Sequence, residues 1–281
     1  MTLADELFDI EHEAYRKSPV HILDARIKLI LCLAGLLATV FLPFNASSDG
    51  IIPWTQIFGL AALYLLFWAL YFLSGASVRY YLLRLMILIP FGIFIIILQP
   101  FFFNPYYDAY HVIFTLPFGI NVYWESLVFG ISLFLKFIIS LSFIILLSAT
   151  TTMQSLVQGA ARMRVPRIFI TVLTLTVRYL FVFAQIFKKI QLAFSCRCFQ
   201  GTGRGMKLKY RLNVIGNAAG SLFVRALEQG ERTYLSMCCR GYNDDSSVFV
   251  RKKPITSYEW VFLAVGILYI VIVPVLIYTM F

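Results

Sequence analysis

Long apolar windows are the feature of this sequence that most constrains its fold. Five of them are long enough, or nearly so, for a helix to cross the hydrocarbon core of a bilayer, which takes about 20 apolar residues. They cover residues 28–44, 51–73, 80–103, 126–149 and 258–281. Only 14% of the 281 residues are charged and 60% are hydrophobic, so a water-soluble fold could not bury this much apolar surface. We therefore predict an all-α polytopic membrane protein with about five transmembrane helices.

The loops between these windows predict the orientation of the spans, because Lys and Arg stay on the cytoplasmic side of a membrane protein. Lys and Arg precede the first window and flank the turn between the second and third, whereas residues 45–50 and 104–125 contain none. The segment 1–19 is polar and acidic, unlike the start of a signal peptide. We expect a multi-pass protein of the plasma (inner) membrane, with its N-terminus in the cytoplasm and its C-terminus outside.

Positive charge is concentrated in one part of the chain. Residues 150–256 contain 17 of the 24 Lys and Arg but only 4 of the 14 Asp and Glu. In an apolar chain, such a block fits anionic lipid headgroups or acidic protein partners better than nucleic acid. We therefore divide the chain into a cytoplasmic N-terminal segment (1–27), a four-helix transmembrane region (28–149), a basic cytoplasmic module (150–256) and a C-terminal transmembrane helix (257–281).

Two long amphipathic helices are predicted within the basic module. The window 168–187 is long enough to span, but both of its flanks are cationic and Arg178 at its centre would be costly against lipid. We expect it to lie along the cytoplasmic boundary and to cross the next helix, with a sixth span as the alternative. In that next helix the polar face comprises Arg225, Glu228, Gln229 and Arg232. The apolar face has helical spacing and comprises Ala219, Leu222, Phe223, Ala226, Gly230, Tyr234 and Met237.

A similar cysteine-arginine tag ends each of these helices, LAFSCRCF at 192–199 and LSMCCRGY at 235–242. Small residues before each arginine allow two helices to approach closely where they cross. Arg197 and Arg240 then project beyond the crossing, and Gly241 can cap its helix. One interpretation is structural, because a cation near a helix C-terminus complements the helix dipole. The other is that each arginine pairs with a carboxylate of a partner, and two similar helix ends then imply a paired partner.

The spacing of the tag cysteines argues against a metal site. Structural zinc sites favour roughly two to four residues between paired cysteines, whereas here one pair is C-x-C and the other is adjacent. Neither His21 nor His111 is close to the tags in sequence. We expect no metal site and no cofactor, and we expect these thiols to behave as small apolar side chains. The four thiols are Cys196, Cys198, Cys238 and Cys239.

Four segments carry a resemblance to a known family. SPVHILDARIKLI (18–30) is similar to the opening Ser-Pro-x-His-x-Leu-Asp-Pro-Arg-x-Lys, with Ala25 in place of the proline. RVPRIF and VRYLFVF, and then SLFVRALEQGERTYLSMCCRGY (221–242), resemble two coupling helices. Together they resemble the transmembrane (T) component of energy-coupling-factor (ECF) transporters, in particular its cobalt-type branch. The Ala-Arg-Gly tags of that family read Cys-Arg-Cys and Cys-Arg-Gly here, and their arginines correspond to Arg197 and Arg240.

This resemblance implies the T subunit of an ABC-type importer, which links two cytoplasmic ATPase subunits to a substrate-binding (S) membrane subunit. ATP hydrolysis would belong to the partners, in keeping with the absence of a G-x-x-x-x-G-K-[ST] phosphate loop from the sequence. We expect no enzyme activity in this chain and uptake of cobalt, with nickel or a vitamin as alternatives. The residues expected to dock on the ATPases are Ser195, Cys196, Arg197, Cys239, Arg240 and Gly241. Those expected to contact the S subunit are Leu222, Phe223, Ala226 and Gly230.

Two other classes of function stay open at this point. A stand-alone secondary carrier would show repeated spans with polar groups at the midplane, whereas the repeat here lies in the tags. A membrane enzyme using the Cys-Arg block would need a base beside its thiol, and no histidine or carboxylate clusters with Cys196 or Cys238 in the sequence. Lys136 lies inside the fourth window, where it is either functional or directed to a protein interior or the interface. Asp24 is expected to cap the first helix.

Overall fold

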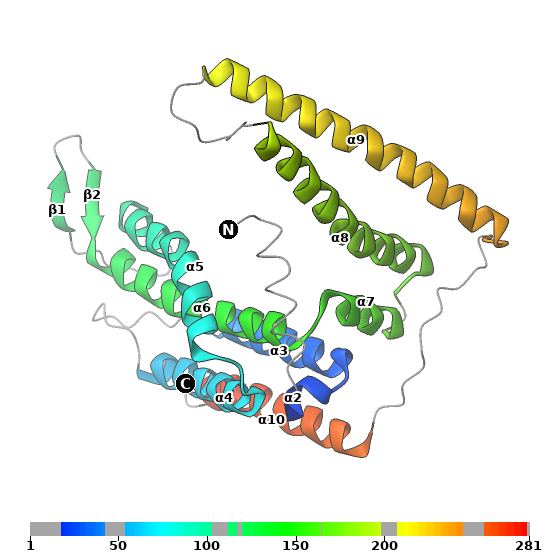
Figure 1. The fold of residues 1–281 in the computed structure, drawn as a ribbon. Helices are drawn as coiled ribbons and strands as arrows, with labels where there is room; N and C mark the ends of the chain where they lie inside the picture. Colours follow the sequence, from blue (N-terminus) through cyan, green and yellow to red (C-terminus); the bar gives the residue numbers. More distant parts are fainter. Residues whose placement is uncertain are drawn as a thin grey trace. The chain divides into compact units, whose positions relative to one another are not determined.

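The computed structural model describes residues 18–42, 54–102, 112–116, 120–163, 165–197, 207–243 and 256–279. The chain divides into two compact units (Figure 1). The first, here called the bundle unit, takes in Ile10–Gly159 and Lys253–Phe281. The second, here called the helix-pair unit, covers among the described residues those within Ala160–Lys252. The domain limits expected at residues 27, 149 and 256 stay a prediction.

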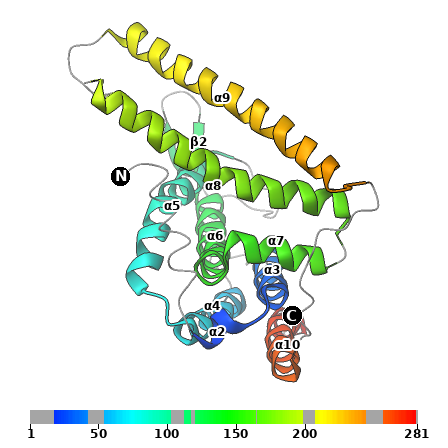
Figure 2. The ribbon, with the colours of Figure 1, turned by 45° about the vertical axis from the view of Figure 1, so that its right-hand side comes forward.

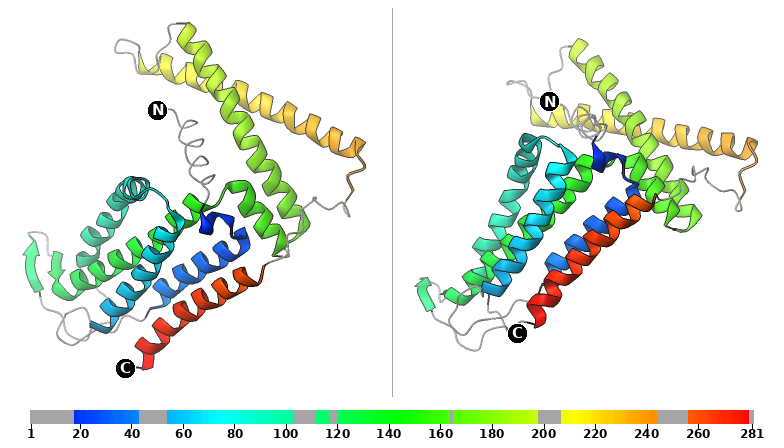
Figure 3. Two further views of the ribbon diagram at one scale, coloured as in Figure 1. Left: turned by 60° about the horizontal axis from the view of Figure 1, so that its bottom comes forward. Right: turned by 90° about the horizontal axis from the view of Figure 1, so that it is seen from below.

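The bundle unit is helical, as predicted. Its helices α3, α4, α5, α6 and α10 lie side by side (Figure 3), and the 3-10 turn η1 (Gln99–Phe101) follows α5. The short α2 precedes α3, and α7 begins in this unit and ends in the other. The bounds are α2 Pro19–Ile22, α3 Ala25–Phe41, α4 Trp54–Ser74, α5 Val78–Leu98, α6 Trp124–Thr150, α7 Met153–Arg162 and α10 Ser257–Thr279.

A two-stranded hairpin lies within the connection at 104–125 and departs from the all-α fold that we predicted. Strands β1 (Val112–Leu116) and β2 (Ile120–Tyr123) pair antiparallel, with Val112 opposite Tyr123 and Leu116 opposite Ile120. Both strands are rich in the β-branched and aromatic residues that favour extended backbone. The run was too short to stand out against the long apolar windows on either side, so hydropathy did not find it.

Five described helices are long and apolar enough to cross a membrane, which makes this a multi-pass membrane protein. Four of them, α4, α5 with η1, α6 and α10, correspond to the windows predicted at 51–73, 80–103, 126–149 and 258–281. The window at 28–44 forms α3, which has 17 residues and is short for a bilayer core. The fifth candidate is α8 (Arg167–Cys196) of the helix-pair unit, so the alternative of a span at 168–187 stays open.

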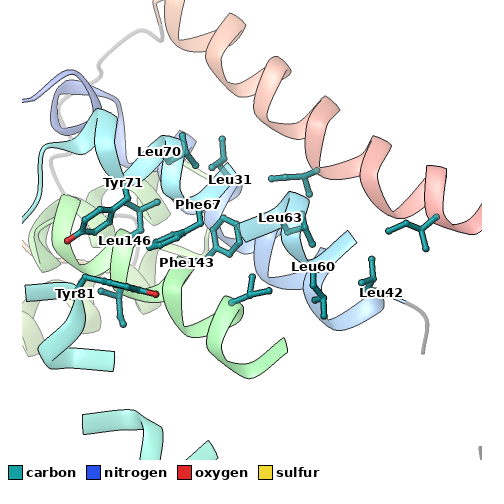
Figure 4. Packing of buried hydrophobic residues seen from close by; sticks show 14 residues of the cluster. Leu31, Leu42, Leu60, Leu63, Phe67, Leu70, Tyr71, Tyr81, Phe143 and Leu146 are labelled. Atoms are coloured by element: carbon teal, nitrogen blue, oxygen red, sulfur yellow. The ribbon is translucent and has the colours of Figure 1, made fainter. Parts of the chain in front are cut away.

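An aromatic cluster between α4, α5 and α6 forms the core of the bundle unit (Figure 4). Phe67 and Phe143 are fully buried, with ring centroids 6.1 Å apart. The ring of Tyr81 lies 5.2 Å from that of Phe67, and the Tyr81 hydroxyl is 2.9 Å from the hydroxyl of Ser142. Because lipid tails are as apolar as the side chains, close packing and interhelical hydrogen bonds of this kind hold membrane helices together.

Glycines allow the closest helix contacts around this cluster. A Cβ on Gly35 of α3 would come within 2.8 Å of the Phe143 ring. In α10, a Cβ on Gly266 would collide with the side chain of Leu31. Small residues at such positions let helix backbones approach one another, so α3 packs closely on α6 on one side and on α10 on the other.

Two lysines hold α3 and α6 together at both ends of their contact. The Lys28 Nζ donates to the Thr150 carbonyl at the end of α6, at 2.9 Å, and the Lys136 Nζ donates to the Leu42 carbonyl just after α3, at 2.6 Å. Lys28 and Leu42 are fourteen residues apart, as are Lys136 and Thr150, so the two helices run antiparallel and in register. Lys136 is therefore directed into the protein interior, where it satisfies the carbonyl group that ends the short α3.

The helix-pair unit consists mainly of two long helices, α8 (Arg167–Cys196) and α9 (Leu208–Cys239). They run in opposite directions (Figures 1 and 2) and cross each other at an angle (Figure 3). The long helices expected in the basic module are therefore present, and each ends at the cysteine that precedes the tag arginine.

Candidate functional site

One face of α9 is partly covered by α8. Its half-buried residues recur every three or four positions, which is the spacing of one helix stripe. The hydroxyl of Tyr179, near the middle of α8, contacts the hydroxyl of Thr233, six residues before the end of α9. No described residue of α9 is fully buried. The stripe comprises Val214, Ala218, Leu222, Ala226, Gln229, Thr233 and Met237.

The two tags form helix ends of the same geometry. Arg197 ends α8 with φ −92° and ψ 17°, and Arg240 ends α9 with φ −91° and ψ 10°. The Arg197 N–H donates to the Phe194 carbonyl at 3.0 Å, and the Arg240 N–H donates to the Met237 carbonyl at 3.0 Å. Both arginines are exposed. The likeness of the two octapeptides is therefore also a likeness of structure, with one guanidinium presented at each helix end.

Gly241 completes the cap of the second tag. It has φ +78°, a left-handed conformation that glycine adopts at little steric cost. Its N–H donates to the Cys238 carbonyl at 2.9 Å, and the next residue, Tyr242, donates to the Met237 carbonyl at 3.0 Å. This pair of bonds is the Schellman motif. The C-cap role predicted for Gly241 is thereby confirmed, whereas the residue after Arg197 lies outside the described part of the chain.

The tag arginines lie at opposite ends of the helix pair. α8 has 30 residues and α9 has 32, and because they are antiparallel, the end of α8 lies beside the start of α9 (Figure 2). At 1.5 Å per residue, a 30-residue helix is roughly 45 Å long. Arg197 and Arg240 are thus too far apart to hold one small ligand between them.

The same geometry separates the tag thiols. Cys196 lies at one end of the pair, whereas Cys238 and Cys239 lie at the other, and all three are free and exposed. They cannot share one metal ion across the length of a helix. Among the described residues, no group of three or more His, Cys, Asp and Glu could hold a metal. Cys198 and His111 fall outside the described residues, and His21 lies in α2, where its Nδ1 is 2.7 Å from the Ser18 hydroxyl.

A second stripe of α9 is apolar and exposed. Phe223 is 70% exposed, Leu227 58% and Tyr234 63%, and with the exposed Gly230 they repeat at intervals of four, three and four residues. Gly230 and Tyr234 also line an open apolar groove of about 620 Å³ between the two helices. This stripe, here called the open stripe, adjoins the one that faces α8, so the apolar face of α9 is wider than α8 covers.

The residues predicted to contact a second membrane subunit divide between these two stripes. Phe223 and Gly230 belong to the open stripe, while Leu222 and Ala226 are half-buried on the side toward α8. Leu222 also lines a second apolar groove, of about 400 Å³, beside the end of α8. Gln229, which we placed on the polar face, is instead half-buried in the stripe facing α8. Arg225, Glu228 and Arg232 are exposed as predicted.

Comparison with known proteins gives one family. The model of the CbiQ family, described as cobalt transport protein, matches residues 16–250. Two relatives come from Methanocaldococcus jannaschii. Uncharacterized protein MJ1571 is 28% identical over 184 residues, which are 65% of this chain and 61% of that protein. Uncharacterized protein MJ1089 is 27% identical over 234 residues, which are 83% of this chain and 80% of that protein. The match therefore spans less than two thirds of the first relative and most of the second.

Proposed function

The chain belongs to the CbiQ cobalt transport protein family, the transmembrane components of ECF transporters, and on that premise we propose that it is the coupling subunit of an ATP-driven importer. It joins two cytoplasmic ATPase subunits to a separate membrane subunit that binds the substrate. The observation that carries this proposal is the pair of exposed arginine caps of equal geometry at the two ends of one antiparallel helix pair.

Each arginine cap docks on one ATPase subunit. A guanidinium offers five donors in a planar fork that matches a carboxylate, and it remains charged in a partly buried contact. Small residues beside each arginine let the partner surface approach the helix end. Two equal caps roughly 45 Å apart suit a partner made of two equal subunits. The docking residues are Ser195, Cys196 and Arg197 at one end, and Cys239, Arg240 and Gly241 at the other.

The open stripe of α9 contacts the substrate-binding subunit. Large exposed apolar side chains gathered on one helix face mark an interaction surface, and Phe223 and Leu227 are exposed by 70% and 58%. Leu222 and Ala226 support this stripe from the side packed on α8. When the ATPases draw together, the two helices change their mutual angle, and the open stripe passes that change to the substrate-binding subunit.

The transported substrate is cobalt, following the description of the family, with nickel or a vitamin as the alternatives. The substrate is bound on the separate subunit, and ATP is hydrolysed by the two ATPases, so this chain is not itself an enzyme. The helix pair and the N-terminus lie in the cytoplasm, and the bundle unit lies in the plasma (inner) membrane. This orientation follows from the basic residues at 150–256.

The test replaces each tag arginine by glutamate in the intact complex. Arg197→Glu and Arg240→Glu, singly and together, are compared with Arg225→Glu, which changes the same charge at an exposed position in the middle of α9. We expect the ATPases to co-purify with the Arg225 variant and to be lost progressively from the single and double tag variants, together with uptake of labelled cobalt. If the double tag variant assembles and transports like the wild type, the docking role is refuted. Uptake that proceeds without ATPases would instead support a secondary carrier.

A further inference from the structure

The segment 18–28, here called the N-terminal corner, folds into two capped helix starts. Ser18 caps α2, and its hydroxyl accepts from the His21 N–H at 3.4 Å. Asp24 caps α3, and its carboxylate accepts from the Arg26 N–H at 3.2 Å, which confirms the cap expected for Asp24. Asp24 and Lys28 are only 4% and 7% exposed. Such burial of charged side chains requires that they be hydrogen-bonded within the fold.

Lys28 fastens the chain where it leaves the bundle unit. Its ammonium donates to the Thr150 carbonyl at 2.9 Å and to the His21 carbonyl at 3.2 Å, so one cation joins the ends of α6 and α2. One turn earlier in α3, Ala25 packs on Gly159 of α7, where a Cβ on the glycine would lie 3.2 Å from the Ala25 Cβ. Both contacts lie in the bundle unit, immediately before the chain passes at Gly159 into the helix-pair unit.

Glu259 forms hydrogen bonds at the start of α10, where the chain re-enters the bundle unit. It is 5% exposed, and one carboxylate oxygen accepts from the Thr256 N–H at 2.9 Å, as in a capping box at the start of α10. The other oxygen accepts from the Asp24 N–H, also at 2.9 Å. The two partners belong to helix starts that are far apart in sequence. A carboxylate can hold both, because each of its oxygens is an acceptor.

Between residues 18 and 279 the chain passes from one unit to the other after Gly159 and again before Lys253, and the N-terminal corner contacts described residues of the bundle unit near both of these connections. We propose that Lys28 and Glu259 are positioning residues for energy coupling. They fix both connections to the start of α3, so that movement of the helix-pair unit displaces the membrane helices instead of being absorbed in the connections. This inference rests on the proposed function, because it needs a driven movement of the helix pair.

The experiment measures uptake per ATP hydrolysed in complexes reconstituted in lipid vesicles, with Lys28→Met and Glu259→Gln. We expect both variants to assemble and to hydrolyse ATP, and uptake per ATP to fall about fivefold or more, within the usual range of coupling free energies. Lys136→Met is the matched control. It removes another lysine cap between the same two helices, but one that touches neither connection, so it is expected to leave uptake per ATP unchanged.

A rescue separates positioning from a merely structural role. Cysteines at positions 25 and 159 have Cβ atoms close to the roughly 3.5–4.5 Å of a disulfide, so Ala25→Cys with Gly159→Cys can tie the exit connection to α3 covalently. In the Lys28→Met background, oxidation of this cysteine pair should restore uptake per ATP, and a reductant should lower it again. Either cysteine substitution alone should leave the uptake per ATP of Lys28→Met unchanged under both conditions. If Lys28→Met fails to fold, Glu259→Gln, which keeps the side-chain volume and one acceptor oxygen, carries the test.

Two outcomes overturn the inference. One is an unchanged uptake per ATP in both variants, and the other is a loss equal to that of Lys136→Met. In either case the wild-type complex would still assemble and couple, so the proposed function would stand. If the wild type does not bind ATPases, or if the double tag variant transports normally, the proposed function itself falls.

Discussion

Replacing Gly35 by alanine should destabilise the bundle unit, although alanine is the better helix former. The new Cβ would lie 2.8 Å from the Phe143 ring, and this ring cannot retreat, because it is fully buried and packs against Phe67. Overpacking of this kind costs about 1–3 kcal/mol, and the gain in helix propensity offsets about 1 kcal/mol. We therefore expect a net loss of about 1 kcal/mol, and a fall in Tm of about 2–4 °C.

Labelling of the Cys32 thiol can measure the thermal stability of this part of the bundle unit. It is 7% exposed and lies one turn before Gly35 in α3, so a thiol-reactive dye labels it only when this region opens. In a background without the other cysteines, the labelling temperature of Gly35→Ala is compared with that of Leu33→Ala, an exposed position of the same helix. Phe143→Leu should relieve the clash with the new Cβ. The variant that carries both Gly35→Ala and Phe143→Leu should therefore lose less stability than the two single variants lose together. A higher labelling temperature for Gly35→Ala, as helix propensity alone predicts, would refute the packing argument.

Three further predictions concern the helix pair. Cys196, which is exposed, should react with a maleimide within minutes in the isolated chain, and bound ATPases should protect it, whereas buried Cys32 should stay unreactive in both states. Gly241→Val should cost about 1–2 kcal/mol at the α9 cap, because its φ of +78° is left-handed, and titration should show weaker ATPase binding with the bundle unit unaffected. Phe223→Glu should release the substrate-binding subunit in a pull-down but keep the ATPases, whereas equal loss of both would contradict separate surfaces.

Hydrophobic length and charge placement predicted most of the helices, because each is a local property of the chain. The end of the 17-residue α3 also has a local signal, because Pro43 follows Leu42 and helices usually end before a proline. The carbonyl of Leu42, however, accepts a hydrogen bond from Lys136 of another helix. The sequence placed Lys136 inside an apolar window but could not name its partner. The similar geometry of the two tags could also be predicted, because a repeated octapeptide at the end of two helices implies two similar helix ends.

The N-terminal corner could not be assembled from the sequence. Its bond between Asp24 and Glu259 joins residues that are 235 positions apart, and no local pattern connects them. A capping box at Thr256–Glu259 would have been the only signal, and it accounts for just one of the two carboxylate bonds. Likewise, the pattern showed a single apolar face on α9, and only the packing of α8 divides that face into a covered and an open stripe, with Gln229 on the covered side.

The reciprocal lysine caps bear on how far a movement at the N-terminal corner travels. Sliding α3 against α6 by one helical turn, about 5.4 Å, would break both the Lys28–Thr150 and the Lys136–Leu42 hydrogen bonds. Four polar groups would then lose these partners in an apolar setting. A buried polar group without a hydrogen bond costs about 1–3 kcal/mol. Bending at Gly35 is opposed by the Phe143 ring. The packing of the Phe143 ring on Gly35 keeps the two helices in register even when Lys136 is replaced. A displacement imposed where Lys28 meets Thr150 is therefore delivered, over roughly 21 Å of helix, to Leu42 at the far end of α3, in the wild type and in Lys136→Met alike.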